Sequence, residues 1–164
     1  MKHEPKPGQK LAAEDFDDAV RLTPLVAIDV IVRSPDGRVL VGRRRNEPAK
    51  GQFFTTGGRI TKNETLAAAF RRISLAELGV ELNIEHAQFV GVFEHLYATN
   101  NHEVPGFGTH YVVLAYEVTA AEKDLRLPAD QHGEFERMTE AELLRSPEVH
   151  PNVKAYFTAT KAGG

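Results

Sequence analysis

The sequence predicts an α+β domain in which helices cover both faces of a β-sheet. Apolar, β-branched runs bounded by turn residues indicate several strands, a helical stretch lies between them, and two short helical segments follow near the C-terminus. Strands and helices mixed in this order favour a helix–sheet–helix sandwich. The 164 residues, 41% hydrophobic and 26% charged, fit one globular domain with an adequate core.

The first two strands are expected to form a hairpin. Leu25 to Val32 is an apolar, β-branched run, residues 34–37 have the turn sequence Ser-Pro-Asp-Gly, and a second run extends from Val39 to Arg43. A further short strand is predicted from Phe53 to Thr56. This strand leads into a pair of glycines.

The central helix is predicted to end at Gly79. Its N-terminus is either Thr65 or, as a capping box with Glu64, Thr61, and the sequence leaves both open. On a helical wheel Glu77 lies on the apolar face, together with Leu66, Phe70 and Ile73. Burial of an unpaired carboxylate is costly, and the helix dipole opposes a negative charge in the last turn. Either Glu77 bends into water at a fraying helix end, or it holds a cation.

Two features before this helix also have a structural and a functional interpretation. Gly57 and Gly58 let the backbone approach a ligand closely, and their carbonyls are hard oxygen donors that suit Mg²⁺. Asp29 interrupts the first strand, on the face that carries Leu25, Ala27 and Ile31. It is either a half-exposed strand residue or a functional one.

The second half of the chain adds two strands and two short helices. The strands are predicted at Phe89–Leu96 and Tyr111–Val118, separated by a polar loop over residues 98–109 that is long enough to act as a lid. Thr139 and Glu142 form a capping box for one helix, and 151–158 is the other.

Composition excludes several classes of partner and site. The net charge of −3 argues against a general nucleic-acid-binding surface. No apolar run approaches the roughly 20 residues of a membrane helix, and the first ten residues lack the apolar core of a signal peptide. The sequence has no cysteine, so neither disulfides nor thiolate metal sites can form, and we expect a cytoplasmic protein.

The segment from 57 to 80, GGRITKNETLAAAFRRISLAELGV, resembles the signature of the Nudix hydrolases. The positions that match in register are Gly58, Glu64, Arg72, Glu77, Gly79 and Val80. Ile73 and Ala76 stand where the family has Glu, and Ser74 stands where it has an aliphatic residue. Two acids that ordinarily help hold several divalent ions are therefore missing.

These departures resemble the GDP-mannose mannosyl hydrolase branch of the family, which keeps one metal-binding Glu in the signature. Other segments similar to that branch are RLTPLVAIDVIV, GRRRNEPAKGQFF, RRISLAELGVEL, GVFEHLYATN, HYVVLAYEV, LPADQHGEF and NVKAYF. The resemblance runs from about Phe16 to Phe157 and implies the Nudix fold, a mixed sheet sandwiched between helices. We therefore expect a flexible tail over 1–15, a single Nudix hydrolase domain over 16–164, and a homodimer.

The resemblance assigns a metal site and a base. It implies that Mg²⁺, with Mn²⁺ as the alternative, is held by the Gly57 carbonyl, Glu77 and Gln131. It implies that His132 is the general base. A neutral amide is an unusual ligand, but it suits a hard cation whose other ligands are water and diphosphate.

The remaining assignments concern the GDP-sugar substrate. By resemblance, Asp29 and His95 contact the sugar, Arg44 contacts GDP, and Tyr111 hydrogen-bonds the leaving group. A histidine or tyrosine in a strand is otherwise a satisfied polar or packing residue, and the run that contains Arg44 is otherwise a solvated hairpin end.

Two further arginines follow the glycine pair. Arg59 lies directly after it, where its guanidinium can bridge two phosphate oxygens. Arg72 has two open roles: an ion pair with Glu64, as in ordinary Nudix proteins, or the catalytic phosphate contact that the branch implies.

One metal and a histidine base imply attack by water on the anomeric carbon, so that GDP leaves whole and the sugar inverts. Activity should then rise with pH through the histidine titration, near pH ~6.5 if unshifted. The substrate expected by resemblance is GDP-mannose, with GDP-glucose as a second sugar. The alternatives are a conventional pyrophosphohydrolase of another nucleoside diphosphate derivative, and a non-catalytic nucleotide-binding module.

Overall fold

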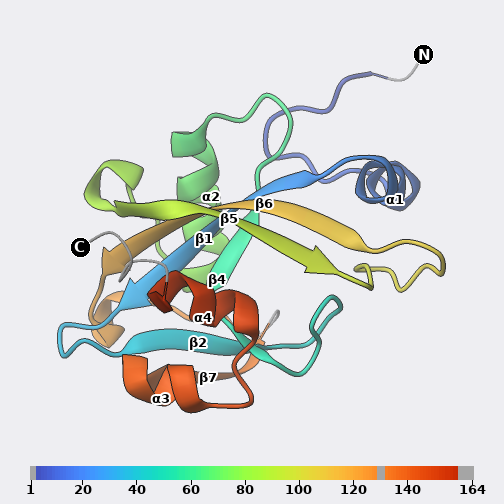
Figure 1. Ribbon diagram of the computed structural model, residues 1–164. Coiled ribbons are helices and arrows are strands. Elements are labelled where there is room, and N and C mark those ends of the chain that lie inside the picture. The colour runs from blue at the N-terminus through green and yellow to red at the C-terminus, as the bar shows by residue number, and fades with distance from the viewer. Residues whose placement is uncertain (1–2, 129–131, 159–164) are drawn as a thin grey trace.

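The structure is a mixed β-sheet with helices on both faces (Figure 1). The computed structural model describes residues 3–128 and 132–158. Within them the strands are β1 (Leu25–Arg33), β2 (Val39–Arg44), β3 (Phe53–Phe54), β4 (Thr56–Arg59), β5 (Gln88–Tyr97), β6 (Thr109–Thr119) and β7 (His132–Met138). The helices are α1 (Ala13–Leu22), α2 (Leu66–Leu78), α3 (Glu140–Arg145) and α4 (Pro151–Thr158), with 3₁₀ turns at Ile84–His86 and Glu122–Asp124. The predicted α+β class is confirmed.

Strand β1 is the centre of the sheet. It runs parallel to β6 and antiparallel to β4, while β5 pairs with the outer side of β6 and β2 pairs with β3 and β7. Alternate β1 residues enter different cores. Ile28 and Val30 belong to the core with Phe70 and Ile73 of α2, whereas Ile31 belongs to the core formed with α3 and α4. Burial of both faces explains why β1 reads as a continuous apolar run.

The predicted hairpin forms at its turn but does not extend along the strands. Gly37 adopts φ +88° in the turn, and the two strands pair where Arg33 lies opposite Val39. Beyond this point β4 and β6 flank β1, and β2 turns to β3 and β7. The single strand expected from Phe53 to Thr56 is likewise divided, because Phe53–Phe54 pairs with β2 and Thr56–Arg59 pairs with β1.

Helix α2 begins and ends at residues that the sequence identifies as possible caps. The Thr65 hydroxyl accepts a hydrogen bond from the Ala68 amide, so Thr65 is the N-cap. Thr61 instead donates to Glu64 within the preceding loop. At the other end Gly79 adopts φ +72°, and a Cβ there would lie 2.0 Å from the Arg126 carbonyl oxygen.

Helix α1 begins inside the segment expected to be a flexible tail. Its residues Phe16 and Val20 are one helical turn apart in an otherwise largely polar stretch, which is too few apolar positions for a clear periodic signal. Before the helix, the Gly8 amide donates to the Thr61 hydroxyl at 2.7 Å. The expected boundary at Phe16 therefore divides a helix.

The C-terminal helices agree with the sequence prediction. Thr139 and Glu142 form both hydrogen bonds of a capping box at α3, and α4 spans Pro151–Thr158. Both helices cover the sheet face opposite α2 (Figure 1). None of the helices in the described part of the chain is long and apolar enough to span a membrane.

Candidate active site

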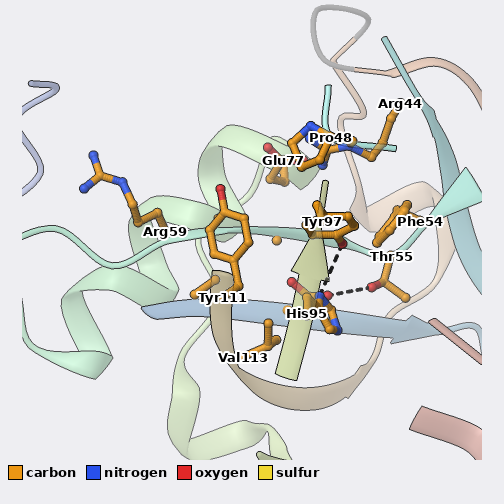
Figure 2. Close-up of a pocket in the computed structure, with 14 residues that line it drawn as sticks. Arg44, Pro48, Phe54, Thr55, Arg59, Glu77, His95, Tyr97, Tyr111 and Val113 are labelled. Atoms are coloured by element: carbon orange, nitrogen blue, oxygen red, sulfur yellow. Dashed lines mark hydrogen bonds between the residues drawn. The ribbon is translucent and has the colours of Figure 1, made fainter. Parts of the chain in front are cut away.

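A pocket lies over the middle of the sheet (Figure 2). Its volume is about 570 Å³, including the open space at its entrance. It is lined by Ala27, Asp29, Arg44, Pro48, Phe54, Thr55, Gly57, Gly58, Arg59, Glu77, His95, Tyr97, Tyr111 and Val113. These residues come from six strands, β1 to β6, from α2, and from the segments after β2 and β3. The predicted site residues among them are Asp29, Arg44, Gly57, Arg59, Glu77, His95 and Tyr111.

The pocket floor depends on a glycine. In the antiparallel ladder of β1 and β4, Gly57 lies opposite Asp29. A Cβ on Gly57 would come within 2.3 Å of Asp29 Oδ1 and 2.7 Å of the Ile28 carbonyl oxygen. No side chain fits there, so the backbone of β4 can pass directly beside the carboxylate.

The Asp29 carboxylate is held by two hydroxyl groups. The Tyr156 hydroxyl donates to Oδ2 at 2.5 Å, and the Thr55 hydroxyl donates to the same oxygen at 3.2 Å. Burial raises the pKa of Asp29 to about 6, although both hydrogen bonds lower it. The carboxylate is therefore a fixed acceptor at the base of the pocket.

His95 is the buried imidazole beside this carboxylate. The residue is 4% exposed, its Nε2 lies 3.2 Å from the Tyr156 hydroxyl, and its Nδ1 lies 3.5 Å from the Tyr97 hydroxyl. Burial, with a smaller effect from His150, lowers the pKa of His95 to about 4. The imidazole is therefore neutral at physiological pH, with each ring nitrogen facing a phenol.

Glu77 enters the pocket from the last turn of α2. Glu77 is 5% exposed, so it lies on the buried face that the helical wheel indicated and does not bend into water, whereas Leu66 from the same predicted apolar face is 44% exposed. Ile73 lies in the core with Phe70, and Ala76 is exposed. Of the three positions where the Nudix signature has an acid on this helix, only Glu77 therefore presents a carboxylate to the pocket.

Two arginines reach the pocket from different sides (Figure 2). Arg44 Nε donates to the Pro48 carbonyl at 2.9 Å, and the Arg44 guanidinium lies 5.5 Å from the centre of the Phe54 ring. Arg59 lies 5.0 Å from the ring centre of Phe16 on α1, and burial lowers the pKa of its guanidinium. Both cations are positioned by contacts with protein groups before any ligand binds.

Arg72 is engaged outside this pocket. Its Nε and Nη2 donate to the two oxygens of Glu64, at 2.7 and 2.9 Å, and Nη2 also donates to the Arg59 carbonyl at 2.8 Å. This bidentate pair lowers the pKa of Glu64 to about 2. Of the two roles left open for Arg72, the ion pair with Glu64 is present, and this residue is not among those that line the pocket.

A family model for the NUDIX domain matches residues 23–160. The chain belongs to the Nudix family. It is 37% identical over 158 residues to the low-salt glycan biosynthesis protein Agl8 of Haloferax volcanii, covering 94% of this chain and 93% of that protein. It is 30% identical over 132 residues to an RNA pyrophosphohydrolase of Caulobacter vibrioides, covering 74% of each.

Solved Nudix structures share this fold. The MutT protein of Methanosarcina mazei superposes with a TM-score of 0.67 at 15% identity, over 85% of this chain and 94% of that one. A MutT NUDIX hydrolase of Burkholderia pseudomallei gives 0.65 at 26% identity, over 82% and 97%. The NUDIX domain of Shewanella oneidensis NrtR, in a complex with ADP ribose, gives 0.61 at 15% identity, over 93% and 99%.

Nudix hydrolases use divalent cations, and the donor atoms here fit Mg²⁺. Gly57 and Glu77 line one pocket, and a backbone carbonyl and a carboxylate are the hard oxygen ligands that Mg²⁺ prefers. The described residues hold no group of three His, Asp or Glu side chains arranged for a metal. A cation would therefore rely on Glu77, the Gly57 carbonyl and a further ligand, for which Gln131 is the predicted residue.

Gln131 lies outside the described residues, as does the side chain of His132. The backbone of His132 begins β7 and pairs opposite Arg44. The start of β7 is thus adjacent to a strand position that lines the pocket, while the predicted ligand and base roles stay predictions.

Three polar residues of the site were not foreseen. Tyr97 and Thr55 line the pocket, and Tyr156 lies behind it. Tyr97 is two residues after His95 on β5, so the period of a strand could have identified it as sharing a face. Tyr156 gives no such signal, because it is brought to Asp29 across 127 positions of sequence.

Proposed function

We propose that this Nudix hydrolase converts GDP-mannose, and by extension GDP-glucose, to GDP and free sugar in a Mg²⁺-dependent reaction. Water attacks the anomeric carbon, and the sugar leaves with inverted configuration. The observation that carries this proposal is the presence of one helix carboxylate, Glu77, in a pocket whose base holds the fixed polar pair Asp29 and His95.

The number of acids on α2 that can bind a metal indicates whether water attacks phosphorus or carbon. Attack on phosphorus in most Nudix enzymes uses several metals to share charge, and their ligands include acids at the positions of Ile73 and Ala76. Here Ile73 is buried in the apolar core and Ala76 is a methyl group at the surface. A single cation suits charge neutralisation on a diphosphate that leaves intact.

The leaving group would be GDP. Arg44 and Arg59 supply fixed positive charge, and the Tyr111 hydroxyl supplies a hydrogen-bond donor, because burial raises the pKa of Tyr111 and keeps it protonated. A cation held by Glu77 and Gly57 would add electrostatic stabilisation of the diphosphate. Arg72, itself held by the ion pair with Glu64, would act by holding the end of β4, where Arg59 lies.

The sugar would occupy the base of the pocket. Asp29 and His95 can accept hydrogen bonds from its hydroxyl groups, which fixes the orientation of the anomeric carbon. His132 removes a proton from water as the new bond to this carbon forms, and the bond from carbon to the diphosphate oxygen breaks. The electron pair of that bond leaves with GDP.

Sequence relatives support a sugar-nucleotide substrate. The relative that covers nearly the whole chain at 37% identity carries a name from glycan biosynthesis. The RNA pyrophosphohydrolase relative favours the second candidate, cleavage of a nucleoside diphosphate derivative at phosphorus, and it covers a smaller part of the chain. We also propose a homodimer, which is the state expected for this branch.

Product analysis separates the candidates. Purified protein is incubated with GDP-mannose and Mg²⁺, and the products are resolved by anion-exchange chromatography and phosphorus NMR. The proposal predicts GDP and mannose. GMP with mannose 1-phosphate would establish the conventional reaction, and binding of GDP-mannose without turnover would indicate a non-catalytic module.

A further inference from the structure

Helix α4 supplies a buried tyrosine directly behind the sugar end of the pocket. Tyr156 is 1% exposed, and its ring packs edge-on against Phe93 of β5, with the two ring centres 4.7 Å apart. Its hydroxyl contacts both Asp29 of β1 and His95 of β5. This residue lies in the NVKAYF segment, to which the proposed reaction gives no role.

The hydrogens in this contact can be assigned by counting donors. A phenol has one hydrogen, and the Tyr156 hydroxyl donates it to Asp29 Oδ2 at 2.5 Å. Thr55 donates to the same oxygen, as expected of an ionised carboxylate. The contact between the Tyr156 oxygen and His95 Nε2 at 3.2 Å then requires that Nε2 carries the hydrogen. Because His95 is neutral, its Nδ1 is left as an acceptor.

We propose that Tyr156 is a positioning residue, which fixes His95 in the Nε2–H tautomer and holds the Asp29 carboxylate so that both residues present acceptors to the pocket. Those acceptors are Asp29 Oδ1, which lies beside the bare Cα of Gly57, and His95 Nδ1, whose one lone pair a ligand hydroxyl would take in place of the Tyr97 hydroxyl 3.5 Å away. Two acceptors recognise a ligand with two hydroxyl donors, such as a hexose. This last step rests on the proposed function, whereas the tautomer does not.

The tautomer can be measured without a substrate. Full-length protein with ¹⁵N-labelled histidine is studied by two-bond proton–nitrogen correlation NMR, and the His95 signals are assigned by their loss in His95→Gln. The wild-type protein is expected to show the Nε2–H pattern alone. Tyr156→Phe is expected to show a mixture of tautomers, while the matched control Tyr116→Phe, which removes a phenol on the other sheet face, leaves the pattern unchanged.

Two NMR results would contradict the proposed role of Tyr156. An Nδ1–H pattern in the wild-type protein would reverse the assigned hydrogen bonds, and an unchanged His95 pattern in Tyr156→Phe would show that other groups fix the imidazole. If Tyr156→Phe does not fold, the wild-type spectrum still decides the tautomer.

Kinetics test whether Tyr156 affects binding of the sugar and not of GDP. With GDP-mannose, Tyr156→Phe is expected to lower kcat/KM about tenfold, while the dissociation constant for GDP alone stays at the wild-type value. Equal weakening of GDP binding would show a general structural defect and would contradict a role at the sugar. If wild-type protein turns over no GDP-sugar, the proposed function fails while the NMR result still stands.

Discussion

Gly57 lies opposite Asp29 in the ladder of β1 and β4, so close that a Cβ on Gly57 would overlap Asp29 Oδ1. The relationship joins two parts of the proposed reaction, because the same short strand passes the carboxylate proposed to bind the sugar and carries the carbonyl proposed to bind the cation. The absence of a side chain at position 57 is therefore a requirement of the pocket as well as of the pairing between β4 and β1.

Substitution of Gly57 should damage the pocket more than the fold. Gly57→Ala forces Asp29 or β4 to move, and we expect a loss of about 1–3 kcal/mol in the free energy of unfolding. A displacement of about 1 Å should lower kcat/KM roughly 100-fold. Urea denaturation and steady-state kinetics measure the two effects. Gly91→Ala is the control, since its Cβ meets only the edge of the Phe93 ring, at 3.3 Å. Equal activity of the two variants would contradict the requirement at Gly57.

The Glu77 carboxylate should determine cation affinity. Glu77→Gln keeps the shape of the side chain and removes its charge, so we expect Mn²⁺ binding, followed by electron paramagnetic resonance, to weaken roughly tenfold or more. Chelation of divalent cations should abolish wild-type turnover, and added Mg²⁺ should restore it. Glu81→Gln, at an exposed glutamate just after α2, should bind Mn²⁺ like the wild type. Wild-type affinity in Glu77→Gln would remove Glu77 from the metal site.

The Arg72–Glu64 pair should stabilise the fold in a pH-dependent way. The pKa of Glu64 falls from 4.5 to about 2 on folding, so its contribution is present above about pH 4.5 and is lost as the pH falls towards 2. Glu64→Gln should therefore cost about 2 kcal/mol at neutral pH and progressively less in acid. Urea denaturation at several pH values measures this trend. A destabilisation that is the same at pH 7 and pH 3 would show that the pair does not act through charge. Glu85→Gln, at an exposed residue, is the control.

The general base should be visible in the pH profile. If His132 accepts the proton of water, His132→Gln should lower kcat about 10²- to 10⁴-fold, with KM little changed, and should remove the rise of kcat with pH. Substitution of His86, an exposed histidine distant from β7 in sequence, should leave the profile as it is. Full activity in His132→Gln would require another base.

The periodicity of the sequence predicted on which face of a strand or helix individual site residues lie. Strand alternation placed Asp29 on the same face as Ala27, which also lines the pocket, and helical periodicity placed Glu77 on the buried face of α2, because both inferences need only neighbours within a few residues. The same reasoning was wrong for Leu66, which belongs to the first turn of α2 and lies beyond the edge of the sheet core. Periodicity indicates a face but not where the core ends.

What the sequence did not predict depends on contacts between distant segments. Tyr156 reaches Asp29 only because α4 packs on the face of the sheet opposite α2, and Phe16 contacts Arg59 only because α1 packs near this pocket residue. The predicted hairpin forms only next to its turn for the same reason, because β4 and β6 pair with the rest of β1 while β2 pairs with β3 and β7. Such outcomes are decided by tertiary packing.

In the proposed reaction, water attacks carbon and not phosphorus. The most direct test is turnover of GDP-mannose with Mg²⁺ in ¹⁸O-labelled water, followed by mass spectrometry of the products. Attack on carbon gives labelled mannose and unlabelled GDP, with β-mannose as the first anomer seen by proton NMR. Label on GMP or on mannose 1-phosphate would contradict it.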